Sequence, residues 1–203
     1  MHPKIGILAL QGDFAEHVQV VKRLKAEPVL VKTPDSLASV DALIIPGGES
    51  TTISRLMKKS GIFPLLKRLV GEGLPVYGTC AGAVLLAKNT GDARVRPLGA
   101  LDISVKRNAY GPQKESFEGA VAIVHGKARG RVIKGVFIRA PLITRTGRKV
   151  AILAVRKENG SIHPVAVRQG NVIATTFHPE LTGETLFHSM LKELAERRQN
   201  EQA

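Results

Sequence analysis

Short apolar runs alternate with amphipathic stretches along the first half of the chain. The apolar run at residues 5–10 is followed by apolar side chains at helical spacing, namely Phe14, Val18, Val21 and Leu24. Further apolar runs lie at residues 29–31, 42–45 and 74–77, and the last two are separated by amphipathic segments at 54–57 and 64–70. This alternation predicts parallel strands joined by crossover helices.

The pattern changes after about residue 100. Strand-like runs then follow one another with little helix between them, at residues 101–105, 120–124, 135–138, 150–155, 163–167 and 172–176. A last amphipathic helix is predicted at residues 185–197. We therefore expect an α/β fold, a three-layer α/β/α sandwich with a mainly parallel central sheet and an antiparallel extension. Residues 1–198 are expected to form a single domain, and residues 199–203 a frayed tail.

Composition narrows the class of protein. With 203 residues, of which 43% are hydrophobic, the chain can bury a sizeable core. No apolar run approaches the roughly 20 residues of a membrane span, and the run at 5–10 is shorter than a signal-peptide core. The single cysteine excludes an internal disulfide and a multi-cysteine zinc site, and a free thiol suits a reducing compartment. We expect a cytoplasmic protein.

Positive charge is concentrated in one part of the chain. The segment from Arg94 to Lys149, called here the basic stretch, holds thirteen Lys and Arg residues against three acids, in a chain of formal net charge +13. Such a surface attracts anionic partners. Nucleic acid is not expected, because the chain is 4% aromatic, lacks tryptophan and carries no nucleic-acid motif. The alternatives left open are a docking surface for another protein and a solvated face.

The one cysteine lies in a sequence typical of a nucleophile elbow. Cys80 is the centre of Gly78-Thr79-Cys80-Ala81-Gly82, between a strand-like run and the predicted helix at residues 81–88. In such an elbow the chain turns sharply at the nucleophile, and glycines stand where a Cβ would clash with neighbouring backbone. The helix start also favours a thiolate at Cys80. The alternative is a small buried hydrophobic residue in a strand-to-helix turn.

A nucleophilic cysteine needs a base and a group that orients the base. His178 and Glu180 are two residues apart at the end of a predicted strand, so their side chains are expected on the same side. The alternative for this pair is a surface ion pair, or a carboxylate that caps the next helix.

An oxyanion needs hydrogen-bond donors. Gly47 and Gly48 follow the strand-like run at 42–45 and permit a turn whose backbone N–H groups point at a substrate. Gly48 is the candidate donor from this loop, and the backbone of Ala81 is the other. The alternative is a plain strand-to-helix connection with Ser50 or Thr51 as the N-cap.

These residues resemble the class I glutamine amidotransferases, whose triad is Cys-His-Glu. Within that group the chain is similar to the glutaminase subunits of pyridoxal phosphate synthase, and the similarity spans nearly its whole length. The motifs that carry it are, in order, GILALQG at 6–12, PGGESTT at 46–52, FIRAP at 137–141, VRQG at 167–170 and FHPELT at 177–182. Departures from the family pattern are Tyr110 in place of Phe, Pro112 in place of Arg, and the basic segment 127–134.

The resemblance implies hydrolysis of L-glutamine to glutamate and ammonia, with Cys80 as nucleophile, His178 as acid and base, and Glu180 as the orienting group. It implies an oxyanion site at Gly48 and Ala81, and no metal or cofactor. It implies glutamine contacts from Gly48, Glu49, Ser50, Arg107, Ile138 and Arg139, although a structural ion pair is the alternative for the two arginines. It also implies ammonia transfer to a separate synthase subunit, with Gln11 and His17 near the docking surface.

Two other functions are compatible with the same residues. A cysteine peptidase or deglycase-like hydrolase on a related fold would also use an elbow cysteine. A non-catalytic binding subunit would use the basic stretch as its working surface and would not need Cys80.

Overall fold

The computed structural model describes residues 2–107, 116–158 and 160–202. Tyr110 and Pro112, which depart from the family pattern, lie outside the described residues. The elements of the first half are β1 (Lys4–Leu8), α1 (Phe14–Arg23), β2 (Glu27–Val31), α2 (Pro34–Ala38), β3 (Ala42–Ile45), α3 (Ser50–Lys59), α4 (Ile62–Gly71), β4 (Val76–Thr79) and α5 (Ala81–Leu86). The second half holds β5 (Ala87–Asn89), β6 (Leu101–Lys106), β7 (Ser116–Ile123), β8 (Val132–Ile138), β9 (Leu142–Thr146), β10 (Ala151–Glu158), β11 (Ser161–Gln169), β12 (Val172–Thr175), the 3₁₀ helix η2 (Pro179–Thr182) and α6 (Leu186–Gln202).

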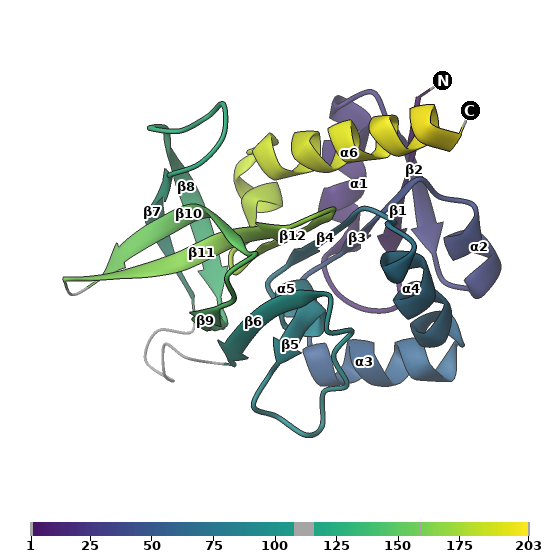
Figure 1. The fold of residues 1–203 in the computed structure, drawn as a ribbon, viewed down its shortest axis with the longest axis horizontal. Helices are drawn as coiled ribbons and strands as arrows, with labels where there is room; N and C mark the ends of the chain where they lie inside the picture. The colour runs from purple at the N-terminus through teal and green to yellow at the C-terminus, as the bar shows by residue number, and fades with distance from the viewer. Residues whose placement is uncertain (1, 108–115, 159, 203) are drawn as a thin grey trace.

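A mixed sheet of nine strands runs through the described part of the chain, in the order β2-β1-β3-β4-β12-β11-β10-β7-β8 (Figure 1). The neighbours from β2 to β12 pair in parallel. The neighbours from β12 to β8 pair antiparallel. The predicted sandwich with a parallel sheet and an antiparallel extension is therefore confirmed. The last parallel strand, β12, comes from far along the chain and lies directly beside β4, which brings the segment before His178 next to the segment before Cys80.

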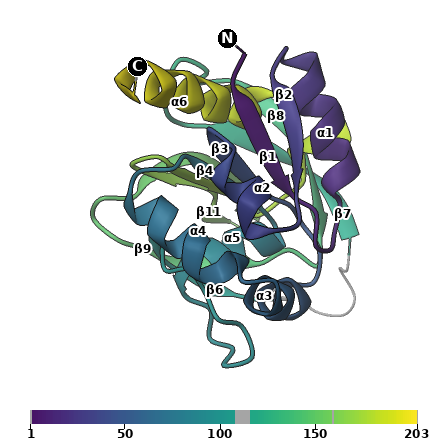
Figure 2. The ribbon, with the colours of Figure 1, turned by 90° about the vertical axis from the view of Figure 1, so that its right-hand side faces the viewer.

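Helices cover both faces of the parallel half. Along β3, Leu43 and Ile45 pack into one core cluster, whereas Ala42 and Ile44 pack into the other. The first cluster includes residues of α3, α4 and α5, and the second includes residues of α1 and α6. Both views show α1 and α6 on one side of the sheet and α3 and α4 on the other (Figure 1 and Figure 2). Every residue of β3 is buried and successive side chains point to opposite faces, which is what a sheet covered on both faces requires.

A small second sheet was not predicted. It has the order β5-β6-β9. The helix expected at residues 81–88 ends at Leu86, because Ala87 takes an extended conformation and pairs with Leu101. The backbone N–H of Leu98 also donates a hydrogen bond to the carbonyl of Leu85, at 2.7 Å. A short apolar run is compatible with helix or strand, and here the tertiary pairing decides.

The last helix is longer than the sequence indicated. It continues to Gln202, through most of the tail that was expected to be frayed. The side-chain amide of Gln199 donates to Oδ2 of Asp41 at 2.8 Å, which ties this end of α6 to the turn before β3. Among the helices that are described, none is long and apolar enough to cross a membrane.

Candidate active site

Cys80 occupies the sharp turn between β4 and α5. Its φ of 48° lies in the left-handed region that non-glycine residues seldom adopt. Such strain is kept where the surrounding structure enforces it, typically at functional sites. Gly82 shows how close the packing is, because a Cβ there would lie 2.1 Å from the carbonyl oxygen of Ile45. This close approach is the clash with neighbouring backbone that sequence analysis gave as the reason for glycine in the motif.

The sulfur of Cys80 lies at the edge of a cavity rather than deep in the core. The residue is 7% exposed, and its Sγ lies 3.6 Å from the carbonyl oxygen of Ile138. The cavity, of about 400 Å³, is called here the Cys80 cavity. Its lining comes from six separate regions of the chain: Asp13, Gly48, Glu49, Ser50, Cys80, Ala81, Val84, Arg107, Ile138, Arg139, Pro141 and His178.

His178 and Glu180 form a close pair beside this cavity. Nδ1 of His178 lies 2.7 Å from Oε1 of Glu180, and both side chains are almost completely buried. The backbone N–H of His178 donates to the carbonyl of Val136 at 2.8 Å, and Pro179 begins η2 directly afterwards. The imidazole is therefore fixed by the chain on both sides of its Cα and by the carboxylate at its Nδ1.

The environment of His178 favours its protonated form. Burial alone would lower the pKa of His178, but hydrogen bonds to Cys80 and Glu180 and the negative charges of both groups raise this pKa to about 10. An imidazolium next to a sulfur stabilises the thiolate form, which is the nucleophilic form of a cysteine.

A second buried histidine lies behind Glu180. Nε2 of His17 is 3.5 Å from Oε1 of Glu180 and 3.2 Å from Oγ1 of Thr79, and its Nδ1 is 2.8 Å from Nε2 of His188. Burial is the largest influence on His17 and lowers its pKa to about 3, although the charge of Glu180 acts in the opposite direction. His17 is therefore neutral, so that Glu180 is contacted by one charged and one neutral imidazole.

Two loops hold each other in place above the cavity. Oε1 of Gln11 accepts the backbone N–H of Glu49 at 2.9 Å, and the backbone N–H of Asp13 donates to the carbonyl of Gly47 at 3.2 Å. Gly47 also packs closely against the imidazole of His178: a Cβ on Gly47 would be 2.3 Å from Cε1 of that ring. The diglycine loop is therefore positioned by the loop that follows β1 and by His178.

Opposite charges line part of the Cys80 cavity. Arg107 forms ion pairs with Glu49, at 2.7 Å, and with Asp92. Burial alone would raise the pKa of Glu49, but hydrogen bonds from Thr51 and Thr52 lower it below its usual range. Glu49 is therefore ionised at neutral pH, and a zwitterionic ligand would meet both signs of charge here.

The sequence profile of the SNO glutamine amidotransferase family matches residues 7–196. The chain belongs to the SNO glutamine amidotransferase family. It is 45% identical over 192 residues to "Pyridoxal 5'-phosphate synthase subunit PdxT" from Fervidobacterium nodosum, which covers 95% of this chain and 97% of the relative. It is 46% identical over 190 residues to the protein of the same name from Methanothrix thermoacetophila, covering 94% and 98%. A solved structure described as "Crystal structure of glutamine amidotransferase" superposes with a TM-score of 0.85 at 45% identity, covering 95% of this chain and 98% of that one.

Most of the residues that sequence analysis selected in this SNO family chain line the Cys80 cavity. This holds for the nucleophile, the histidine, the candidate oxyanion donors and the candidate glutamine contacts, namely Cys80, His178, Gly48, Ala81, Glu49, Ser50, Arg107, Ile138 and Arg139. Glu180 lies behind His178 instead. Sequence analysis offered two interpretations of Arg107, a glutamine contact or a structural ion pair. Arg107 does form an ion pair, with Glu49, and both residues line the Cys80 cavity, so the ion pair and the candidate glutamine contact occupy the same position.

The expectation that His17 lies near a docking surface stays a prediction, but its side chain cannot reach a partner in this conformation. His17 is completely buried, because it is the residue of α1 that faces the sheet next to Glu180 and His188. Helix α1 turns this position inward and leaves the partly exposed Gln11, before the helix, near the surface.

Sequence analysis missed three residues of the Cys80 cavity. Asp13, Val84 and Pro141 line it without having been selected, although Asp13 and Pro141 adjoin or belong to recognised motifs. Burial raises the pKa of Asp13, whose Oδ2 lies 4.0 Å from Nδ1 of His178. Within the described ranges no three His, Cys, Asp or Glu side chains are grouped so that they could hold a metal ion.

Proposed function

We propose that this chain hydrolyses L-glutamine to L-glutamate and ammonia through Cys80, His178 and Glu180. One observation carries the proposal. The elbow cysteine and an imidazole that is paired with a buried carboxylate line the same cavity as the charged pair Arg107 and Glu49. This combination places a nucleophile, its acid and base, and a zwitterion-binding group around one small space.

In the first half of the reaction, the thiolate of Cys80 attacks the side-chain carboxamide carbon of glutamine. The tetrahedral oxyanion is held by backbone N–H groups of Ala81 and of the loop at Gly48. The protonated His178 gives its proton to the departing nitrogen, so the C–N bond breaks, ammonia leaves and a thioester remains. Glu180 balances the charge of the imidazolium before this step and holds the ring in place during it.

In the second half, His178 is neutral and accepts a proton from water. The hydroxide attacks the thioester carbonyl, the C–S bond breaks, and glutamate leaves. Cys80 is then again a thiolate and His178 again carries a proton, as at the start, so that glutamine and water have given glutamate and ammonia.

Substrate recognition is proposed for the other end of the cavity. The α-carboxylate of glutamine would pair with Arg107, and its α-ammonium with Glu49, so that the substrate replaces the existing ion pair with two of its own. Ser50, Ile138 and Arg139 would complete the contacts. The distance between the α-carbon and the carboxamide would then select glutamine by length.

The relatives are named subunits of pyridoxal 5'-phosphate synthase. We propose that the chain likewise acts in a hetero-oligomer and delivers its ammonia to a synthase subunit, with Gln11 near the contact. Residues 1–198 would act as a single glutaminase domain, and the free thiol suits the cytoplasm.

The test is glutamate release from glutamine by the purified chain, with and without the cognate synthase subunit. Cys80→Ala removes the nucleophile, and Ser60→Ala, on the far end of α3, serves as a matched control outside the cavity. We expect release that increases when the synthase subunit is added, is kept by Ser60→Ala and is lost in Cys80→Ala.

The opposite results identify the alternatives. Absence of release from folded protein that binds the synthase subunit would contradict the glutaminase proposal. Turnover of peptides or glycated thiols without turnover of glutamine would favour the peptidase or deglycase. Full function of Cys80→Ala in the complex would favour a binding subunit.

A further inference from the structure

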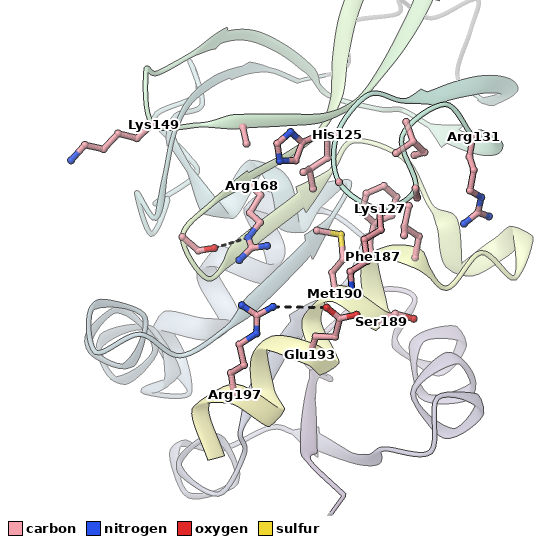
Figure 3. Close-up of a pocket in the computed structure, with 17 residues that line it drawn as sticks. His125, Lys127, Arg131, Lys149, Arg168, Phe187, Ser189, Met190, Glu193 and Arg197 are labelled. Atoms are coloured by element: carbon pink, nitrogen blue, oxygen red, sulfur yellow. Dashed lines mark hydrogen bonds and ion pairs between the residues drawn. The ribbon is translucent and has the colours of Figure 1, made fainter. Parts of the chain in front are cut away.

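A second cavity lies on the other side of the fold from α3 and α4, between α6 and the antiparallel half of the sheet. It has a volume of about 660 Å³ and is called here the α6 cavity (Figure 3). None of its lining residues belongs to the Cys80 cavity. Its volume lies in the range of sites that bind small organic molecules, which span about 300–1,000 Å³.

The floor of the α6 cavity is apolar. Ile123, Leu153 and Phe187 are buried at its base and belong to β7, β10 and α6. Met190, one helical turn after Phe187, is only partly buried, and its side chain points toward the middle of the cavity. An apolar or aromatic group that entered would therefore contact side chains held by three different elements.

The rim of the same cavity is strongly basic. Its Lys and Arg residues are Lys127, Arg131, Lys149, Arg168 and Arg197, and its acidic residue is Glu193. Glu193 lies 3.9 Å from Arg197 and is therefore already paired. Figure 3 shows Arg168 pointing inward, and Lys149 and Arg131 extending at opposite ends.

Three of these cations have no carboxylate partner among the described residues. Arg131 pairs with Glu184, but Lys127, Lys149 and Arg168 form no ion pair with any described residue. The side chain of Arg168 donates to the carbonyl of Gly170, at 2.8 Å. Unbalanced positive charge beside an apolar recess attracts an anion that carries an apolar body.

Three residues of the basic stretch lie on the rim of the α6 cavity. Lys127, Arg131 and Lys149 belong to it, and they come from the loop between β7 and β8 and from the turn before β10. Arg168, at the end of β11, joins them through the sheet. The fold thus gathers charges that are 41 residues apart in sequence, from position 127 to position 168, on one rim.

From this geometry we infer that the α6 cavity binds a small organic anion, with an apolar or aromatic body on Phe187 and Met190 and a carboxylate, sulfonate or phosphate against Arg168 and Lys127. The inference goes beyond the proposed glutaminase reaction and does not depend on it.

The probe is 1-anilinonaphthalene-8-sulfonate, an aromatic sulfonate whose fluorescence rises in an apolar site. The full chain should bind one molecule with saturation. Decanoate, which also has an apolar body and an anionic head, should displace the probe. Inorganic phosphate at matched ionic strength should not, because it lacks the apolar body.

Variants separate the two halves of the site. Lys127→Gln combined with Arg168→Gln should weaken probe binding about tenfold. Met190→Glu should weaken it at least as much, whereas Met190→Leu should keep it. The matched control is Lys59→Gln combined with Lys67→Gln, which removes two exposed cations from α3 and α4 on the opposite face. Thermal unfolding of each variant verifies that it is folded.

Three outcomes would overturn the inference. These are binding of several probe molecules without saturation, equal weakening by the rim variant and its control, and loss of probe binding when the synthase subunit docks. The last would assign the cavity to a protein interface. Glutamate release from the same variants should equal that of the unaltered chain, so failure of this inference is distinguishable from failure of the proposed function.

Discussion

His17 lies behind Glu180, with 3.5 Å between Nε2 of the imidazole and Oε1 of the carboxylate, and neither side chain is accessible to solvent. One arrangement of the protons fits these contacts. If Nε2 of His17 carries the proton and donates to Oγ1 of Thr79, its Nδ1 accepts from Nε2 of His188. Nδ1 of His188 is then a bare acceptor, and it is indeed a buried atom without a hydrogen-bond partner in the described structure. A buried acceptor that lacks a donor costs less than a buried N–H that lacks an acceptor.

This relationship predicts that His17 positions Glu180 and does not contact the synthase subunit. His17→Leu should lower kcat for glutamine by about tenfold, because the buried carboxylate of Glu180 loses the imidazole that contacts it, and should leave KM nearly unchanged. His17→Gln keeps an N–H donor and should recover part of the loss. Affinity for the synthase subunit, measured by calorimetry, should not change in either variant.

The control for these variants is His163→Leu, a change at a partly exposed histidine of β11 outside the Cys80 cavity. A large loss of affinity for the synthase subunit in His17→Gln, with normal folding, would instead support a role of His17 in docking.

The second prediction concerns the titration of His178. Since hydrogen bonds and charges from Cys80 and Glu180 raise its pKa to about 10, the ring should stay protonated through neutral pH in the resting enzyme. Glu180→Gln removes one of these influences and should lower that pKa, and kcat should fall by about 100-fold or more. NMR of labelled histidine follows the titration directly.

The raised pKa of His178 also makes the free energy of unfolding depend on pH. Because this pKa is higher in the folded state than the unfolded value of about 6.5, protonation of His178 stabilises the fold fully below pH 6.5, and this stabilisation is lost as pH rises toward 10. An unchanged His178 titration in Glu180→Gln would show that the carboxylate does not set the charge of the ring.

The third prediction concerns acid stability. His17 and His188 are buried with pKa values lowered to about 3, in both cases chiefly by burial. In the unfolded chain each would take up a proton below about 6.5, so the folded state should lose stability as pH falls from 6.5 toward 3. With two protons, the contribution is at most about 3 kcal/mol per pH unit.

The measurement is urea unfolding between pH 4 and 7. The double variant His17→Gln with His188→Gln should show a flatter dependence of unfolding free energy on pH, whatever its absolute stability. An equally steep dependence would assign acid destabilisation to the carboxylates instead.

The fourth prediction tests the close approach of Gly47 to His178. A Cβ at Gly47 would lie 2.3 Å from Cε1 of His178, so Gly47→Ala must displace the ring or the diglycine loop. We expect kcat to fall by about 100-fold, because a displacement of about 1 Å in an active site has an effect of this size. Gly71→Ala is the matched control, since a Cβ there meets no atom within 4 Å. The control should keep full activity.

The fifth prediction concerns substrate recognition. Arg107→Gln should raise KM for glutamine by about 10-fold to 100-fold and change kcat less, because it removes a binding charge that is remote from the reacting carbon. Arg145→Gln, which breaks an exposed ion pair with Asp102 outside the Cys80 cavity, should leave both constants unchanged. A fall in kcat at constant KM for Arg107→Gln would contradict a binding role.

Some of this protein follows from local sequence alone. The apolar runs at β3 and β4 and the amphipathic α6 are visible as patterns, because burial on one or both faces dictates their periods. The elbow around Cys80 is visible as a local motif, although the contact that requires the glycine at 82 is with the backbone of Ile45 on the neighbouring strand β3. His178 and Glu180 are paired by their spacing in the chain.

Other features depend on contacts between distant segments. The strand β5 is not visible in the sequence, because pairing with β6 overrides a helical pattern. The short helix α2 also went unpredicted, although Thr33 and Ser36 form a capping box at its start. The position of His17 is decided by which side of α1 faces the sheet, and a polar residue on an otherwise ordinary helix gives no sign that it will be buried.

The α/β class, the elbow, and the candidate roles of Cys80, His178 and Glu180 thus follow from the amino-acid sequence alone. The folded chain adds three arrangements. Strand β12 lies beside β4 and so brings His178 to the Cys80 cavity, His17 is buried behind Glu180, and residues of the basic stretch meet Arg168 around an apolar recess. Periodicity and turn chemistry act over a few residues, whereas these arrangements depend on the order in which strands join the sheet and on which faces the helices bury.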